Sequence, residues 1–380
     1  MRYMQKNILH DLKTKMVFLA GPRQVGKTTL AKTILNQRDS IGRYFNWDYT
    51  QDKQSILKEK WAESDTLLIF DELHKYPQWK NWIKGIYDVL KEKHQILVTG
   101  SARLDVYKHG GDSLLGRYHY WRLHPFTLDE CPDEFDEKEA FHRLMTVGGF
   151  PEVFLQGDER EARRWRRDRL NRVLQEDIRD LESIKNIQML MLFVELLRTR
   201  VGGLINYANL AQDLQVAPQT VKSWLLSLER MYVLFQVKPF SQSISRAILK
   251  TPKVYFFDNA DSEDEKGMRF ENLVATSLLK RLHYLEDFTG YRYELSYIRD
   301  KEGREVDFAI IKEGKLVELI EVKYADEDIS PALKYYATKL KPEKSTQIVA
   351  TISKSYDKNG IHVVSPFTYF AKPPWESGIV

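Results

Sequence analysis

The segment GPRQVGKT, residues 21–28, decides the fold class of the N-terminal part of this 380-residue chain. It fits the pattern G-x-x-x-x-G-K-[ST], follows the apolar segment KMVFLA directly, and precedes the helix-forming segment TTLAKTIL. A strand, a glycine-rich loop and a helix in this order gather backbone N–H groups at a helix N-terminus, where they bind phosphate. The segment therefore predicts a phosphate-binding loop (P-loop) that holds a nucleotide.

The side chains of this loop have separate expected roles. Lys27 is expected to reach the β- and γ-phosphates of ATP, and the Thr28 hydroxyl to ligate Mg²⁺. A later segment, ILVTGSA, ends a further strand and offers Thr99 and Ser101 as sensors of the γ-phosphate, or as plain loop residues. The predicted ATP-binding residues are Gly21, Pro22, Arg23, Gln24, Val25, Gly26, Lys27, Thr28, Thr29 and Ser101.

Two acids follow the apolar run TLLIF of a second predicted strand. An acid that ends a buried strand beside a P-loop holds Mg²⁺, directly or through its water shell, and we expect Asp71 in this role. The adjacent Glu72 is expected to orient and deprotonate the attacking water. The N-terminal part is therefore interpreted as a nucleoside triphosphate hydrolase with ATP and Mg²⁺ as cofactors.

The pattern along the chain changes twice. Residues 1–150 alternate short apolar strands with helical stretches, which favours a parallel α/β sheet. Residues 151–258 are mostly helical and open with an arginine-dense segment, whereas residues 259–380 contain one helix followed by strands. The polar, acidic segment NADSEDEKG, residues 259–267, is predicted to be a linker.

Composition limits the other classes of protein. The single cysteine, Cys131, excludes an internal disulfide or a CxxC metal site, and the net charge of +4 is too small to indicate a partner. No apolar run approaches the roughly 18 residues of a membrane span, and the N-terminus lacks the apolar core of a signal peptide. We therefore expect a cytoplasmic protein without a membrane partner.

Several segments together resemble a known family. GPRQVGKTTL, LLIFDE, TGSA, GRYHYWRLHPFTLDE and GGFPEVFL resemble bacterial and archaeal AAA-type ATPases of the STAND-like group. The resemblance implies an ATPase module, then a winged-helix region and a nuclease-like end, and a homo-oligomer by analogy. It also implies that Arg117 is an arginine finger acting in trans, although this residue could instead pair with an acid.

The arginine-dense segment EREARRWRRDRLN, residues 159–171, has two interpretations. On a helix, several of its arginines share one face, and Arg163, Arg164 and Arg167 are the candidate contacts to nucleic-acid phosphates. Alternatively, nearby acids pair with them and the helix is a solvated lid.

Residues 205–240 read as a winged helix-turn-helix, with leucines at helical spacing and QVAP between two helices. If the second helix entered a major groove, the residues facing the bases would be Gln219, Thr220, Lys222 and Ser223. Only one of these is cationic, so the same fold could serve as a packing or protein-contact module.

Near the C-terminus, EVDF and IEVK, which begin at Glu305 and Ile320, resemble the PD-(D/E)XK nuclease signature. By this resemblance Asp307 and Glu321 hold Mg²⁺, Lys323 positions a water molecule, and Glu271 supplies the extra helical acid. The alternative is a salt-bridged strand pair in a nuclease-like fold that has lost catalysis.

The predicted architecture is α/β. It comprises a P-loop ATPase parallel sheet (1–150), a helical lid with a winged helix (151–258) and a restriction-endonuclease-like α/β domain (259–380). The favoured function is ATP-driven processing of nucleic acid, with DNA the expected partner although the sequence does not distinguish it from RNA, and with a metal-dependent nuclease-like end. The alternative is a regulatory ATPase switch whose C-terminal parts bind DNA or protein without cutting.

Overall fold

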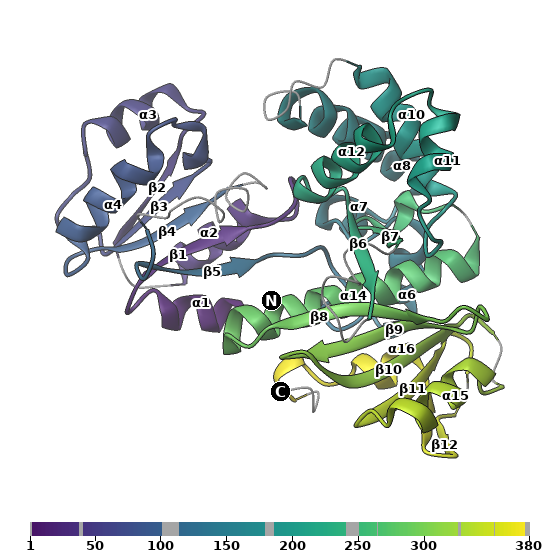
Figure 1. The fold of residues 1–380 in the computed structure, drawn as a ribbon. Coiled ribbons are helices and arrows are strands. Elements are labelled where there is room, and N and C mark those ends of the chain that lie inside the picture. The colour runs from purple at the N-terminus through teal and green to yellow at the C-terminus, as the bar shows by residue number, and fades with distance from the viewer. Residues whose placement is uncertain are drawn as a thin grey trace. The chain divides into compact units, whose positions relative to one another are not determined.

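The computed structural model describes residues 2–37, 41–100, 114–178, 186–240, 251–263, 265–325, 328–352 and 354–376 (Figure 1). The chain forms two compact units, which are treated separately below. Unit 1 comprises Met1–His124 and Arg230–Tyr232, and unit 2 comprises Pro125–Glu229 and Val233–Val380.

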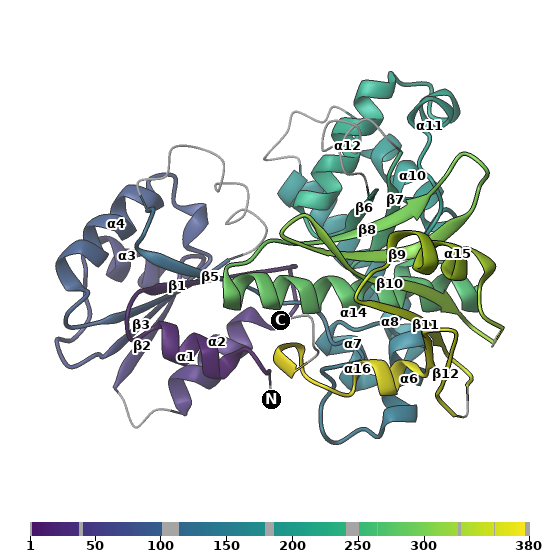
Figure 2. The ribbon, with the colours of Figure 1, turned by 60° about the horizontal axis from the view of Figure 1, so that its bottom comes forward.

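Unit 1 is built on a five-stranded sheet in the order β2-β3-β4-β1-β5, with every pair parallel. This confirms the predicted parallel α/β sheet. The strands are β1 Met16–Ala20, β2 Gly42–Asn46, β3 Leu67–Asp71, β4 Gln95–Thr99 and β5 Tyr118–Arg122. The helices are α1 Gln5–Asp11, α2 Lys27–Asn36, α3 Thr50–Leu57 and α4 Trp79–Leu90, with a 3₁₀ turn at Leu73–Lys75. Figure 2 shows α1 and α2 on one face of the sheet and α3 and α4 on the other.

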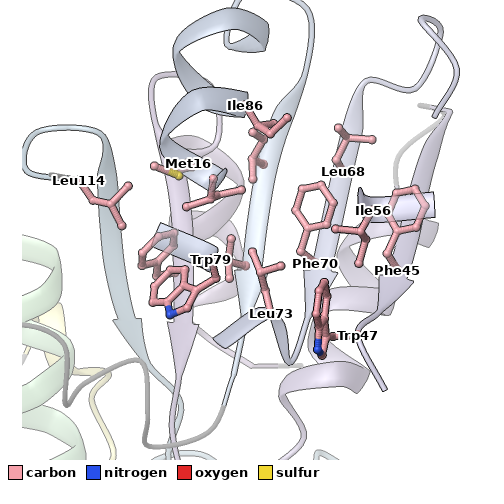
Figure 3. Packing of buried hydrophobic residues seen from close by; sticks show 14 of the residues in the cluster. Met16, Phe45, Trp47, Ile56, Leu68, Phe70, Leu73, Trp79, Ile86 and Leu114 are labelled. Atoms are coloured by element: carbon pink, nitrogen blue, oxygen red, sulfur yellow. The ribbon is translucent and has the colours of Figure 1, made fainter. Parts of the chain in front are cut away.

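The core of unit 1 explains why β1 and β3 read as unbroken apolar runs. Every residue of both strands is buried, because helices cover both faces of a parallel sheet. On the face of α3 and α4 the core is rich in aromatic side chains, and the rings of Phe45 and Phe70 stack with centroids 5.7 Å apart (Figure 3). This packing fixes the carboxyl ends of β1 and β3, from which the P-loop and Asp71 emerge.

Unit 2 begins with helices that precede its sheet. They are α6 Glu137–Thr146, α7 Pro151–Gln156, α8 Glu159–Arg172, α10 Ile187–Arg198, α11 Tyr207–Asp213 and α12 Pro218–Arg230, with a π-helical stretch at Val173–Ile178. Asp158 caps α8 by accepting the Glu161 N–H, and Asn206 caps α11. The pair α11–α12, followed by the antiparallel strands β6 and β7, has the element order of the predicted winged helix, which stays a prediction.

The sheet of unit 2 has eight strands in the order β12-β13-β11-β10-β9-β8-β6-β7. They are β6 Leu234–Pro239, β7 Lys253–Phe256, β8 Tyr293–Arg299, β9 Glu305–Lys312, β10 Lys315–Lys323, β11 Lys344–Val349, β12 Tyr356–Lys358 and β13 Ile361–Val364. The remaining elements are the helices α14 Lys266–Thr289, α15 Pro331–Leu340 and α16 Pro366–Phe370 and the 3₁₀ turns Asn259–Asp261 and Pro374–Glu376. Figures 1 and 2 show α14 running along the strands β8 to β10.

The unit boundary differs from the expected one. Residues 125–150 belong to unit 2, and β6 pairs with β8, so one sheet crosses the expected boundary at residue 258. The prediction that residues 1–150, 151–258 and 259–380 are three separate domains stays a prediction.

The linker predicted at residues 259–267 is wrong. Asn259, Asp261 and Ser262 are buried. The Asn259 amide donates to the Leu144 carbonyl over 2.9 Å, and the Asn272 amide donates to Asn259 Oδ1 over 3.1 Å. Buried polar groups are stable when they are hydrogen-bonded, so a polar sequence here marks an internal network.

The same network gives a structural role to the motif GGFP. Gly148 has φ +89°, and a Cβ at this position would overlap Asp258 Oδ1. A Cβ on Gly149 would overlap the Phe126 carbonyl. The motif therefore lets the chain approach the segment that follows β7.

Candidate nucleotide site and a second acid cluster

The P-loop has the backbone that its glycines require. Gly21 has φ +145°, and a Cβ there would overlap the Leu123 carbonyl. Gly26 has φ +99° and directly precedes α2, whose N-terminus has no side-chain cap. The first N–H groups of α2 are therefore directed toward the space enclosed by the loop, which is the arrangement that binds phosphate.

Lys27 lies inside this loop. Its Nζ donates hydrogen bonds to the Gly21 carbonyl over 3.0 Å and to the Pro22 carbonyl over 2.7 Å, and only 6% of the residue is exposed. The ammonium thus lies among the loop's backbone groups, where β- and γ-phosphates are expected to bind.

Asp71 is brought against the P-loop as the sequence predicts. The Thr28 hydroxyl donates to Asp71 Oδ2 over 2.7 Å, and the Tyr44 hydroxyl donates to the same oxygen over 2.5 Å. The Thr99 hydroxyl donates to Oδ1. Burial, followed by the hydrogen bond to Asp71, raises the pKa of Tyr44. The Thr28 and Asp71 oxygens are the ligand types that Mg²⁺ prefers, so these residues fit the ion.

Sequence reasoning missed Tyr44. Nothing in the letters RYFN, residues 43–46, shows that this hydroxyl meets Asp71. The contact follows from the β2–β3 pairing, in which Tyr44 lies opposite Ile69 and Asn46 opposite Asp71.

Glu72 has the geometry expected of a positioned acid. Its φ of +57° is left-handed, a strained conformation for a residue with a side chain. Its Oε2 lies 3.4 Å from His74 Nε2 and 3.6 Å from Lys75 Nζ. Burial raises the pKa of Glu72, while the charges of Lys27 and Lys75 oppose this shift. A carboxylate near Lys27 with a raised pKa is suited to accept a proton from water.

Two further residues predicted for the ATPase are Arg117 and Ser101. Arg117 forms a bidentate ion pair with Asp88 of α4, with Nε 2.7 Å from Oδ1 and Nη2 3.0 Å from Oδ2. This hydrogen-bonded pair raises the pKa of Arg117 and lowers that of Asp88. The arginine-finger role therefore stays a prediction, and Ser101 lies outside the described residues.

A second acid cluster lies in unit 2, on α14, β7 and β9. Lys253 Nζ lies 2.6 Å from Glu305 Oε1, 3.5 Å from Glu271 Oε1 and 3.7 Å from Asp307 Oδ1. Burial alone would lower the pKa of Lys253, but the charges of Glu271, Asp307 and Glu305 outweigh it and raise that pKa. The sequence did not single out Lys253.

Asp307 of β9 contacts the backbone of β10 beside Glu321. Asp307 Oδ2 accepts the Val322 N–H over 2.9 Å, and Lys323 Nζ lies 2.8 Å from Glu321 Oε1. Burial and the Asp307 charge raise the pKa of both Glu271 and Glu321 to about 7. The charge of Asp307 thus disfavours ionisation of both glutamates.

This cluster does not fit a metal ion as it stands. Within the described part of the chain, no three His, Cys, Asp or Glu side chains are arranged to hold one. The lysine ammonium faces three of the carboxylates, whereas the buried Glu321 Oε2 has no hydrogen-bond partner among the described residues. The predicted Mg²⁺ ligation by Glu271, Asp307 and Glu321 is therefore not seen in this arrangement.

Helix α8 divides its arginines between surface and interior. The side chains of Arg163, Arg164 and Arg167 are 63%, 59% and 71% exposed and lie near Glu159, Glu161 and Asp168. Arg169, by contrast, is buried, with its guanidinium 4.0 Å from the centroid of the Phe150 ring. The candidate phosphate contacts are accessible, and both interpretations of the segment remain open.

The candidate base-reading residues lie on α12. Gln219, Lys222 and Ser223 are exposed, while Val221, Trp224 and Leu225 between and beyond them are buried. An exposed face is necessary for nucleic-acid contact, although a solvated surface has the same property.

Comparison with known proteins adds three domain matches. Residues 13–131 match the AAA domain, residues 138–260 match Domain of unknown function (DUF8612), and residues 266–370 match Domain of unknown function (DUF4143). The AAA match and the loop geometry together support an AAA-type P-loop ATPase with a nucleotide site. The two other matches leave the winged helix and the nuclease-like domain unassigned.

Similar chains occur in bacteria and archaea. Uncharacterized proteins of Mycobacterium bovis and Mycobacterium tuberculosis are 25% identical over 65% of this chain, which spans only 55% of their length. An uncharacterized protein of Methanocaldococcus jannaschii is 24% identical over 84% of this chain and 78% of its own. Solved variants of Thermotoga maritima RuvB align over 62% of this chain and 88% of theirs, at 16% and 18% identity and a TM-score of 0.33.

No helix among the described residues is long and apolar enough to cross a membrane.

Proposed function

We propose that this protein hydrolyses ATP with Mg²⁺ at the P-loop. We also propose that the nucleotide state controls its contact with nucleic acid, for which DNA is the first candidate. The observation that supports hydrolysis is the convergence of Lys27, the Thr28–Asp71 pair and Glu72 at the carboxyl ends of β1 and β3. These are the parts that phosphoryl transfer needs.

Each residue then has a defined task. Lys27 releases the loop carbonyls and binds the β- and γ-phosphates, while the N-terminus of α2 donates N–H groups to them. Thr28 and Asp71 would hold Mg²⁺, and the bound ion would supply positive charge that offsets the charge developing on the phosphate. Glu72 accepts the proton of the attacking water. If Arg117 acts as an arginine finger on a second copy of the chain, its ion pair with Asp88 has to open. A homo-oligomer is therefore part of the proposal.

Contact with nucleic acid rests on the exposed cations of unit 2. Arg163, Arg164 and Arg167 follow one another along α8, and their surface pairs are weak enough to exchange for phosphates. Lys222, with Gln219 and Ser223, adds a smaller polar surface on α12.

A second candidate is a regulatory ATPase switch that binds without cutting. The position of Lys253 among the acids of unit 2 favours it over the predicted Mg²⁺-dependent cleavage by Asp307, Glu321 and Lys323. Cleavage stays a prediction that requires those acids to bind a metal.

The decisive measurement is ATP turnover with and without DNA. We expect Mg²⁺-dependent hydrolysis that DNA stimulates, and loss of the stimulation in the Arg163→Gln, Arg164→Gln, Arg167→Gln triple variant. Arg292→Gln is the matched control, because Arg292 is a similarly exposed arginine paired with Glu294 on β8. Turnover that is unaffected by single- or double-stranded DNA and RNA would leave the DNA-independent switch as the better description.

A further inference from the structure

Lys253 is an unusual lysine because strand pairing fixes its backbone and its side chain is enclosed. It begins β7, lies opposite Val237 of β6, and is 1% exposed. The Tyr297 ring covers it, with Nζ 5.7 Å from the ring centroid. Burying an ammonium is unfavourable unless carboxylates pair with it. The surrounding acids therefore account for a lysine at this buried position.

The oxygen atoms around Lys253 are already engaged. Glu305 accepts from Lys253 through Oε1 and from Arg299 Nη1 through Oε2, the latter over 2.7 Å. Glu271 Oε1 accepts the Tyr255 hydroxyl over 2.6 Å, and Asp307 Oδ2 accepts the Val322 N–H. Each acid thus has a protein donor in addition to the lysine.

A divalent cation bound to these acids would have to occupy the position of the Lys253 ammonium. Ions such as Mg²⁺ and Mn²⁺ bind carboxylate oxygens at about 2.0–2.2 Å, so one bound to Glu271 and Asp307 would lie within repulsive range of Nζ. With the lysine in place, part of the negative charge of these acids is already offset, so the cluster attracts a metal less strongly.

We infer that Lys253 is the built-in counter-ion of this cluster, which holds Glu271, Glu305 and Asp307 together without metal and excludes Mg²⁺ from the predicted nuclease-like site. Neutralising Lys253 should therefore create a divalent-cation site formed by Glu271, Asp307 and Glu321. This inference goes beyond the proposed ATPase, whose activity can be measured separately in every variant.

The experiment titrates Mn²⁺ into nucleotide-free, full-length protein and follows heat of binding and thermal unfolding. Wild type should show no Mn²⁺ response that depends on Asp307. Lys253→Met, which removes the charge and keeps the length, should unfold at a lower temperature and regain stability with Mn²⁺. Its affinity for Mn²⁺ should exceed that of wild type by about tenfold to a thousandfold, the scale on which one neighbouring charge shifts an ionisation.

Controls assign the response to the cluster. Lys253→Met combined with Asp307→Asn should lose the gain, and Lys253→Arg, which keeps the charge, should behave like wild type. If Lys253→Met does not fold, Lys253→Met with Glu305→Gln removes the acid and the base together and should still gain Mn²⁺ binding. Mn²⁺ binding in wild type that Asp307→Asn abolishes would overturn the inference, as would a folded, lysine-free variant with wild-type affinity.

Discussion

Asp71 and Asp307 are two aspartates on strands of α/β sheets, and their hydrogen-bond and charge partners differ. Asp71 accepts hydrogen bonds from three neutral hydroxyls, those of Thr28, Tyr44 and Thr99. Asp307 accepts a backbone N–H and faces the ammonium of Lys253. Hydroxyls orient a carboxylate and leave its charge available to a cation, whereas an ammonium offsets part of that charge.

The difference shows that an acid motif does not by itself indicate metal chemistry. Lys27 is held by carbonyl groups of the P-loop, which are replaceable partners, while Lys253 is surrounded by carboxylates. The first lysine can transfer to a phosphate at low cost, whereas the second would leave buried charges unpaired.

The largest expected effect comes from removing the replaceable lysine. Lys27→Ala should lower ATP turnover by about 10³-fold or more, because it deletes a charge that stabilises the transferred phosphoryl group. Thermal unfolding of the apoprotein should change little, although the variant loses the hydrogen bonds that Lys27 donates to the Gly21 and Pro22 carbonyls. Measured turnover near the wild-type rate would show that this loop does not carry the activity.

Glu72→Gln should lower turnover by about 10²–10⁴-fold while ATP still binds, because glutamine keeps the shape of the side chain and loses its basicity. In wild type the rate should fall as the pH drops through the raised pKa of Glu72, since only the ionised carboxylate accepts a proton. Nucleotide binding by fluorescence and turnover by phosphate release separate the two effects. Wild-type turnover in Glu72→Gln would remove the general-base assignment.

The sequence predicted the nucleotide site because its parts are local. Eight consecutive residues, 21–28, specify the P-loop, and Asp71 ends a run of apolar residues that can only be a buried strand. Tyr44 was missed because its contact with Asp71 arises from the pairing of β2 with β3 and no local motif marks it.

The acid cluster of unit 2 likewise depends on a contact between separate segments that no local motif shows. Asp307, Glu321 and Glu271 are predicted site residues by resemblance alone, whereas Lys253 lies about fifty residues before Glu305 in a strand that reads as ordinary core. The wrong linker prediction has a related cause. A polar segment such as 259–262 is judged by composition, and the buried partners Leu144 and Asn272 that satisfy it are not visible in its own letters.

A smaller effect tests the electrostatics of the second cluster. Burial and Asp307 raise the pKa of Glu321 from 4.5 to about 7, so between these values the folded chain binds more protons than the unfolded chain. The free energy of unfolding should therefore fall as the pH rises from 4.5 to 7 through this group. Asp307→Asn removes one cause of the shift and should flatten that fall relative to wild type.

Denaturant unfolding at both ends of this range measures the effect, and ATP turnover, which depends on unit 1, should be unchanged in Asp307→Asn. An unchanged pH dependence of stability would mean that Asp307 and Glu321 do not interact.

The smallest expected change in stability concerns α8, where the contrast is between exposed and buried arginines on one helix. The triple variant of Arg163, Arg164 and Arg167 to Gln should alter the free energy of unfolding by less than about 1 kcal/mol, because its ion pairs are in water. Arg169→Gln should lower the free energy of unfolding more than the triple variant does, since it removes a buried cation from Asp261.

If the exposed arginines contact phosphates, the triple variant should bind DNA of every sequence more weakly. It should also lose about 0.9 units of slope in the logarithmic salt dependence for each contact removed. Binding measured across a salt series decides between the interpretations, because a solvated lid predicts equal slopes for variant and wild type.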